Sequence, residues 1–225
     1  MAMMVYGNLI QQFNPEASGR DDLGLGRWTY MLFRGTNNTV TRVICGYSPC
    51  ANKKKDSGTV YQQHCRHLIN KLGDNTCPRS RFWEGLLCQM RQWCRAGERL
   101  ILCLDANKNI YLGKLGRELM DLHGLGMKEV MGEFTTRRLG ATYFRGSTPI
   151  DAVWATSDVA VVNACVMPVG YGVGDHRLFV VDFVTALLVG TGCSQQIVQP
   201  ALCCLNTRIV GCALRYIKAL WRNIL

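Results

Sequence analysis

The sequence lacks several features that would place it in a common class of protein. No two of its 12 cysteines form a Cys-x-x-Cys pair, and none stands at zinc-finger spacing with a histidine. No apolar run approaches the roughly 20 residues that span a bilayer, and the start of the chain has no secretory signal pattern. Internal repeats, low-complexity tracts and a reverse-transcriptase-like Tyr-x-Asp-Asp segment are also missing. These absences predict an intracellular protein, nuclear or cytoplasmic, that has no membrane partner and is not secreted.

Acidic residues are scarce relative to basic ones. The chain has 26 Lys and Arg against 16 Asp and Glu, which gives a formal net charge of +10. A basic surface favours polyanions, so weak and sequence-independent binding of DNA or RNA is expected, although a generic basic bias would look the same. A hydrophobic content of 48% over 225 residues is ample for one core, and we expect a monomer with a domain over residues 1–185 and a linker with an amphipathic helix over 186–225.

The apolar periodicity predicts a mixed α/β domain. Two β-rich runs, residues 27–34 and 39–47, flank a Gly/Asn turn and predict a hairpin. Strands are also expected at 1–10, 100–104, 149–154, 159–167 and 178–184, short strands or extended segments at 128–134 and 141–144, and a loop at 11–26. Helical spacing predicts helices at 60–72, 82–95, 115–123 and 207–224. Because His64 and His67 lie three apart in the first of these helices, they could bind a metal, but a solvated face is the favoured interpretation.

The most informative stretch is an apolar run that ends abruptly on Asp105-x-Asn107. Residues 100–104 are Leu-Ile-Leu-Cys-Leu, which predicts a buried strand followed by a sharp polar turn. Open sheets bind their ligands at the carboxyl ends of central strands. An aspartate and an asparagine two residues apart can offer oxygen atoms on the same side, and such atoms suit a hard cation, a phosphate or a water molecule.

Three further polar motifs lie at or beside predicted strand ends. In chain order with the first, the four are Tyr47-Ser48-Pro49, Asp105-x-Asn107, Arg145-x-x-x-Pro149-Ile150-Asp151 and Gly174-Asp175-His176-Arg177. Carboxylates that bind a metal ion, a histidine oriented by a carboxylate, and donors from tyrosine, amide and arginine side chains together suit phosphodiester hydrolysis. Any one of these motifs is common by chance, whereas four in order are not.

This ordered set resembles the endonuclease/exonuclease/phosphatase superfamily, which includes apurinic/apyrimidinic endonucleases, pancreatic deoxyribonuclease and the endonucleases of non-LTR retroelements. The resemblance covers roughly residues 1–185 and is greatest to a retroelement-like subgroup in which Gly-Leu-Gly-Arg-Trp, here residues 24–28, precedes the first hairpin. The stretch 200–220 also looks like the tail of that subgroup. Leu104, Ala106 and Gly174 depart from the residues usual in the family motifs, and Arg145 is a weaker match.

The resemblance implies both a fold and a set of roles. The implied fold is a four-layered α/β sandwich of two mixed β-sheets with flanking helices, incomplete at its N-terminal edge. The implied activity is an endonuclease or phosphodiesterase that depends on Mg²⁺ or Mn²⁺. Asp175 would bind the metal ion and Asp151 would orient His176 toward the scissile phosphate. Asn107 and Asp105 would position and deprotonate the attacking water, with Tyr47 near the phosphate. The residues expected to bind the substrate are Arg145 and Arg177.

One departure from the family pattern bears on activity. The family begins with strands that carry an asparagine and then a metal-binding glutamate, but the only glutamate before Trp28 is Glu16, in a segment expected to be a loop. We therefore interpret the sequence as truncated at its N-terminus and expect impaired catalysis. Three alternatives stay open: a catalytically inactive remnant, a fragment that binds nucleic acid, and a small-molecule phosphatase of the same superfamily.

Overall fold

The computed structural model describes residues 3–5, 7–35, 38–51, 58–112, 114–121, 124–134, 139–171 and 174–184. A six-stranded mixed sheet has the strand order β1-β2-β3-β4-β6-β5, and a second sheet holds the antiparallel pair β7-β8. The strands are β1 (Phe13–Arg20), β2 (Trp28–Arg34), β3 (Val40–Tyr47), β4 (Arg99–Asp105), β5 (Met127–Glu129), β6 (Asp151–Thr156), β7 (Val161–Val166) and β8 (Phe179–Phe183). The predicted α/β sandwich of two sheets is therefore confirmed, with two antiparallel strands in the second sheet as described.

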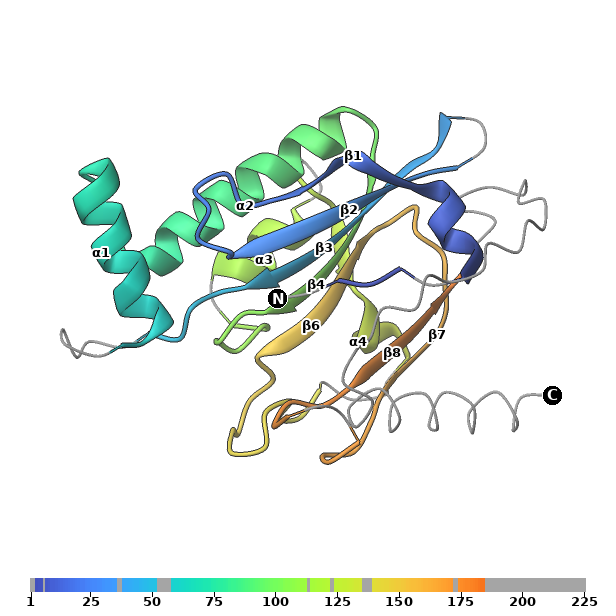
Figure 1. Cartoon of the computed structure of the whole chain (residues 1–225). Helices are drawn as coiled ribbons and strands as arrows, with labels where there is room; N and C mark the ends of the chain where they lie inside the picture. The colour runs from blue at the N-terminus through green and yellow to red at the C-terminus, as the bar shows by residue number, and fades with distance from the viewer. Residues whose placement is uncertain are drawn as a thin grey trace.

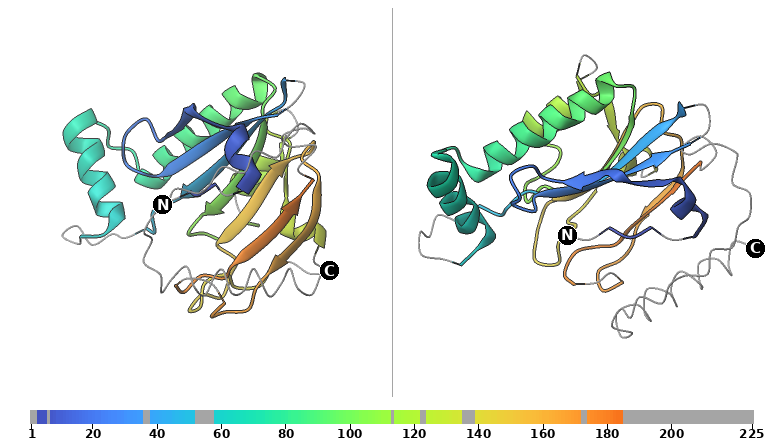
Figure 2. Two further views of the ribbon diagram at one scale, coloured as in Figure 1. Left: turned by 45° about the vertical axis from the view of Figure 1, so that its right-hand side comes forward. Right: turned by 45° about the horizontal axis from the view of Figure 1, so that its top comes forward.

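The helices at Pro78–Arg95 and Lys114–Met120 cover one face of the large sheet, and the β7-β8 pair with the helix at Val130–Phe134 covers part of the other (Figures 1 and 2). The helical elements are η1 (Gly7–Gln12, 3-10), α1 (Val60–Leu72), α2 (Pro78–Arg95), α3 (Lys114–Met120) and α4 (Val130–Phe134). Among the described helices, none combines the length and the hydropathy that crossing a membrane requires. The eight cysteines in the described part of the chain are all free.

Alternation along the central strands divides the core into two. Leu100, Leu102 and Leu104 of β4 point toward α2, where they pack with Phe82 and Met90. The residues between them point to the opposite face, because successive side chains of a strand alternate. That second face packs against α4 and the β7-β8 pair through a separate buried cluster, which contains Ile101, Val130, Met131, Val153, Ala155, Val159 and Ala164.

The hairpin and the two long helices are confirmed. β2 and β3 pair antiparallel throughout, from Trp28 opposite Gly46 to Arg34 opposite Val40. α1 has the predicted bounds and ends at Gly73, whose φ of 62° is the left-handed conformation that glycine adopts without steric cost. α2 begins four residues earlier than predicted, because Pro78 occupies its first turn, where the absent N–H is not needed.

The N-terminal prediction was wrong. A strand was expected at residues 1–10 and a loop at 11–26, whereas the structure has η1 followed by β1, and Glu16 is exposed within that strand. Pro15 and Gly19 obscured β1 in the sequence, but an edge strand with a register shift tolerates both. Gly19 also lies under the Tyr30 ring, where a Cβ atom would come within 2.8 Å of the hydroxyl.

Three smaller predictions also need correction. Residues 128–134 are not one extended segment, since β5 ends at Glu129 and α4 begins at Val130. Residues 141–144 form no strand and contribute an isolated bridge between Tyr143 and His176. His64 is buried rather than solvated, and burial lowers its pKa. The helix predicted at 207–224 lies outside the described residues.

The Gly-Leu-Gly-Arg-Trp segment has a structural role. Arg27 is 2% exposed and forms an ion pair with buried Asp21, with 2.6 Å between Nε and Oδ2. Trp28 packs edge-on against Phe82 of α2, with 5.8 Å between ring centroids. The segment thus anchors the start of the hairpin to the helical layer.

Candidate active site

Three of the predicted site residues lie in one row across the large sheet. β3 and β4 run parallel, and Tyr47 stands opposite Asp105 where both strands end. β6 runs antiparallel to β4, so its first residue, Asp151, stands on the other side of Asp105. All three side chains fall on the face away from α2, in alternation with Leu104 and Ala152 of the core. The register of the sheet therefore brings two carboxylates and a phenol together at the carboxyl ends of β3 and β4 and the start of β6.

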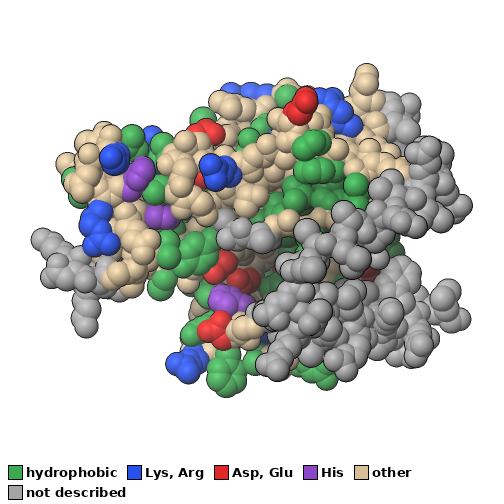
Figure 3. All heavy atoms as spheres, in the orientation of Figure 1, with side chains coloured by type: hydrophobic (Ala, Val, Ile, Leu, Met, Phe, Trp, Pro, Cys, Tyr) green, Lys and Arg blue, Asp and Glu red, His purple; other side chains and the backbone are tan. Residues whose placement is uncertain are grey.

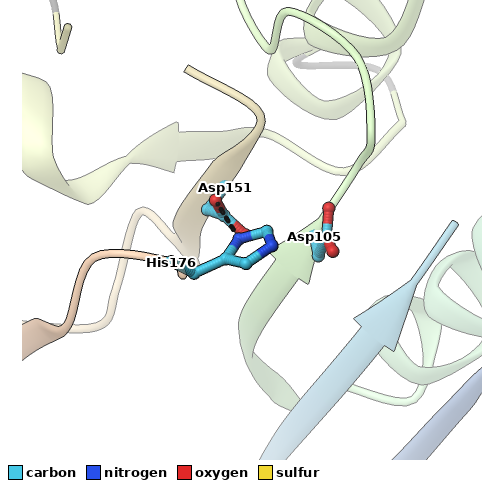
Figure 4. A group of neighbouring side chains, drawn as sticks. All are labelled: Asp105, Asp151 and His176. Carbon is cyan, nitrogen blue, oxygen red and sulfur yellow. Dashed lines mark hydrogen bonds and ion pairs between the residues drawn. The ribbon is translucent and has the colours of Figure 1, made fainter. Parts of the chain in front are cut away.

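His176 joins this row from the segment before β8. Its Nδ1 lies 2.9 Å from Oδ2 of Asp151, which confirms the predicted orienting hydrogen bond. The ring lies between Asp151 and Asp105, and its other nitrogen is on the Asp105 side (Figure 4). One ligand atom from each of Asp105, Asp151 and His176 lies within 4.8 Å of the others, a spacing that could hold a metal ion. The carboxylate of exposed Asp175 lies 4.0 Å from His176 Nε2.

The ionisable groups perturb one another strongly. Burial, and then the charge of Asp151, raise the pKa of Asp105 to about 6. Burial lowers the pKa of His176, but the hydrogen bond and charge of Asp151, together with Asp105 and Asp175, outweigh it and leave that pKa raised. Burial and Asp105 likewise raise the pKa of Tyr47, which keeps its hydroxyl protonated. Perturbed carboxyl and imidazole groups in one cleft are typical of catalytic sites.

Hydrogen bonds to Asp105, Ser48 and Arg79 hold the turn after β4. Asn107 has a φ of 45°, a left-handed conformation that asparagine tolerates. Its backbone N–H donates to Oδ1 of Asp105 at 2.9 Å, and its side-chain amide donates to the carbonyl of Ser48 at 2.9 Å. Arg79 of α2 donates to the carbonyls of Ala106 and Asn107, both at 3.1 Å, and its charge opposes the rise in the pKa of Asp105.

The comparisons with known proteins find a similar fold only at a distance. No family model and no curated protein matches the sequence. The catalytic domain of human Nocturnin, solved with a bound sulfate, matches with a TM-score of 0.48 and 14% identity, over 69% of this chain and 51% of that one. An endonuclease/exonuclease/phosphatase from Bacteroides vulgatus matches with a TM-score of 0.37 and 11% identity, over 69% and 54%. This chain thus spans about half the length of each, and neither similarity assigns a family or an activity to it.

The remaining predicted residues lie at the margin of the cluster. Arg145 is exposed on the turn after Tyr143. Arg177 donates its backbone N–H to the carbonyl of Thr142. Its side-chain Nε is buried without a hydrogen-bond partner among the described residues. Within those residues the acidic cluster contains no glutamate, and Glu16 lies outside it.

Sequence reasoning missed three residues that shape the site. Arg79 had no signal, because it reaches the turn from a helix 27 residues earlier in the chain. Buried Thr142 accepts hydrogen bonds from the backbone N–H groups of Ile150 and Asp151, at 3.0 and 3.1 Å, and so fixes the start of β6. The ring of Tyr143 lies 5.3 Å from that of His176 between centroids.

The cluster lies at one end of an open groove between the two sheets. The groove has a volume of about 860 Å³, and Asp105, Asp151 and His176 contribute to its lining. Most other lining residues are apolar side chains of β3, β4 and β8. In the space-filling view, acidic and histidine side chains gather next to a hollow whose wall is largely hydrophobic (Figure 3).

Proposed function

We propose that this chain is a metal-dependent phosphodiesterase, an endonuclease-like domain of the endonuclease/exonuclease/phosphatase type that acts on nucleic acid. The observation that carries the proposal is the cluster of Asp105, Asp151 and His176 at one sheet edge, with the imidazole held by Asp151. A phosphodiester is a fitting substrate because a cation on the phosphate oxygens and a proton acceptor for water both accelerate its hydrolysis.

The residues present fit a divalent cation. Asp105 and Asp151 offer carboxylate oxygens, the ligands that Mg²⁺ and Mn²⁺ prefer, and exposed Asp175 is a third carboxylate beside them. Burial, and then the charge of Asp151, raise the pKa of Asp105, and a bound cation would favour its ionised form. A cation bound there would polarise a phosphate oxygen and neutralise developing charge. We assign its binding to Asp105 and Asp151, with Asp175 at the solvent side.

The protein's own groups supply proton transfer and positioning. Asp151 accepts a hydrogen bond from Nδ1 of His176, which leaves Nε2 to face the substrate as a base when neutral or as a charged donor when protonated. Asp105, with a pKa of about 6, is ionised at pH 7 and can therefore hold the cation, while the Asn107 amide helps to position the attacking water.

Groups around this pair would bind the rest of the phosphodiester. The Tyr47 hydroxyl stays protonated and can donate to a phosphate oxygen. Arg145 and Arg177 are proposed to contact neighbouring phosphates. The net charge of +10 supports nucleic acid over a small phosphomonoester, because a polyanion gains from every basic residue near its path.

Turnover is expected to be slow. The described cluster holds no glutamate, and two or three carboxylates with a histidine leave a cation with few fixed ligands. Loss of one preorganised electrostatic element typically costs about 100- to 1000-fold in rate. We therefore expect an impaired enzyme whose residual activity depends on Asp105, Asp151 and His176.

The test combines cation binding with nicking of supercoiled plasmid. Calorimetric titration with Mn²⁺ and Mg²⁺ should show binding that Asp105→Asn weakens at least tenfold, whereas Asp182→Asn, an exposed carboxyl on β8, leaves it unchanged. Slow nicking should require the cation and be lost in His176→Ala. Hydrolysis of p-nitrophenyl phosphate without nicking would indicate a small-molecule phosphatase, and salt-sensitive DNA binding without any cation binding would indicate a non-catalytic fragment.

A further inference from the structure

Two cysteines and a tyrosine form a second cluster of reactive side chains, where α1 meets the start of α2 (Figures 1 and 2). The Tyr61 hydroxyl of α1 lies 3.5 Å from the sulfur of Cys77, the residue that precedes α2. Cys65 stands four residues after Tyr61, on the same face of α1. Both helices lie within residues 58–112, which the structure describes without a gap, and neither cysteine is in a disulfide.

The surroundings of Cys77 favour its thiolate form. Cys77 is exposed, so a small reagent can reach the sulfur. Partial burial raises the pKa of Cys77, but the Tyr61 hydroxyl and the backbone N–H groups of Ser80 and Arg79 outweigh it and leave that pKa lowered. Burial, and then the charge of Cys77, raise the pKa of Cys65, so the second thiol lies within electrostatic range of the first. An accessible thiolate with a second thiol nearby is typical of a redox-active cysteine pair.

We propose that Cys77 and Cys65 are a site of reversible oxidation, at which hydrogen peroxide converts the two thiols to a disulfide that joins α1 to α2. The Cys77 thiolate attacks one peroxide oxygen, the O–O bond breaks, and the departing hydroxide takes up a proton and leaves as water. The Cys65 sulfur then attacks the Cys77 sulfenic acid. Its proton goes to the hydroxyl that leaves as a second water, while the S–O bond breaks and the S–S bond forms. The two thiols lose two electrons, and the peroxide gains them.

The disulfide would act on the turn after β4 through Arg79. Its S–S length is about 2.05 Å and its Cα atoms lie within about 7 Å of each other. The two sulfurs are unbonded in this structure, so bond formation moves Cys77 and with it the first turn of α2. Arg79 lies in that turn, and its guanidinium donates to the carbonyls of Ala106 and Asn107. Loss of these contacts would raise the pKa of Asp105 and weaken cation binding, a consequence that rests on the proposed function.

Peptide mapping of the full chain tests the disulfide itself. The reduced protein is treated with hydrogen peroxide, alkylated and digested, and the linked peptides are identified by mass spectrometry. We expect a disulfide between Cys65 and Cys77 that dithiothreitol reverses. Cys77 should be oxidised about tenfold faster than Cys88, an exposed cysteine of α2 that serves as the matched control. Tyr61→Phe keeps the ring but removes the hydroxyl, so it should slow the oxidation of Cys77 about threefold.

Calorimetric titration with Mn²⁺ before and after peroxide treatment tests the effect on the site. Oxidation should weaken Mn²⁺ binding about tenfold in the native protein and in Cys88→Ser, whereas Cys77→Ser, which cannot form the disulfide, should bind Mn²⁺ equally in both states. Absence of Mn²⁺ binding in the reduced protein would refute the proposed function alone, because the peptide map does not depend on it.

The peptide map and the titration can each overturn the proposal. Treated protein without a link between Cys65 and Cys77, or a Cys77 that reacts no faster than Cys88, would show that the pair is not a site of oxidation. Unchanged Mn²⁺ binding by disulfide-bonded protein would show that the bond does not act through Arg79.

Discussion

Replacement of Asp105 by asparagine should stabilise the protein at alkaline pH while removing its cation site. Burial and the charge of Asp151 raise the pKa of Asp105 from 3.8 to about 6, so the folded protein holds an ionised carboxylate that it disfavours. A raised carboxyl pKa means that stability is highest when the group is protonated and falls as pH rises from about 4 to about 6. The full shift corresponds to about 3 kcal/mol, which solvent at this partly exposed site reduces to about 2 kcal/mol.

Urea unfolding at two pH values measures this effect. At pH 8.5, without divalent ions, Asp105→Asn should raise the free energy of unfolding by about 2 kcal/mol, because the neutral amide carries no ionisation cost and its oxygen still accepts the Asn107 N–H. At pH 4 the two proteins should differ by less than about 0.5 kcal/mol. Adding Mn²⁺ at pH 8.5 should stabilise the native sequence and leave the variant unchanged, since only a state that binds the ion gains from it.

The control for this experiment is Asp182→Asn, which removes an exposed carboxyl and should change stability by less than about 0.5 kcal/mol at either pH. A variant that is no more stable than the native protein at pH 8.5 would show that Asp105 carries no ionisation cost. A gain of the same size at pH 4 would assign the effect to packing instead of charge.

Three other predictions concern the same edge of the sheet. Asp151→Asn should remove the group that raises the pKa of His176, so NMR titration of the imidazole should show a lower pKa than in the native protein, and an unchanged value would contradict the observed geometry. Arg79→Met should remove the hydrogen bonds that hold the turn after β4 and should raise the pKa of Asp105, so Mn²⁺ binding should be lost at a higher pH than in the native protein. Arg79→Lys should restore part of the binding at low pH. Identical pH profiles of Mn²⁺ binding in the native protein and Arg79→Met would refute a role of Arg79 in the site. DNA binding should weaken at least tenfold between 50 and about 200 mM salt, with little dependence on sequence, and insensitivity to salt would exclude an electrostatic mode.

The sequence predicted those parts of the site that local patterns determine. Asp105 follows a five-residue apolar run and Asp151 begins another strand, so each was placed at a strand end, and the register then brought them together. Arg79 and Thr142 could not be found this way, because they act through backbone contacts across the fold and carry no motif. Their contribution depends on how α2 and the segment before β6 pack, which no short window of sequence encodes.

The secondary-structure elements likewise divide into those that the local sequence predicts and those that depend on contacts with distant parts of the chain. Helices α1 and α2 follow from helical spacing and from Gly73 and Pro78 at their ends. β1 did not, because an edge strand with proline and glycine reads as a loop until its partner is known. The resemblance to a nuclease superfamily predicted the two-sheet sandwich, whereas the retroelement origin and the truncation remain predictions.

Because Tyr47, Asp105 and Asp151 lie in a single row across three strands, cation binding depends on the register of those strands. A one-residue deletion within β4 would turn Asp105 toward α2 and bring Ala106 into the position beside Tyr47 and Asp151, since successive side chains alternate faces. A two-residue deletion would keep the carboxylate on the correct face but draw it about 7 Å along the strand, out of reach of His176. Cation affinity in such variants would therefore report the register of β4 relative to β3 and β6.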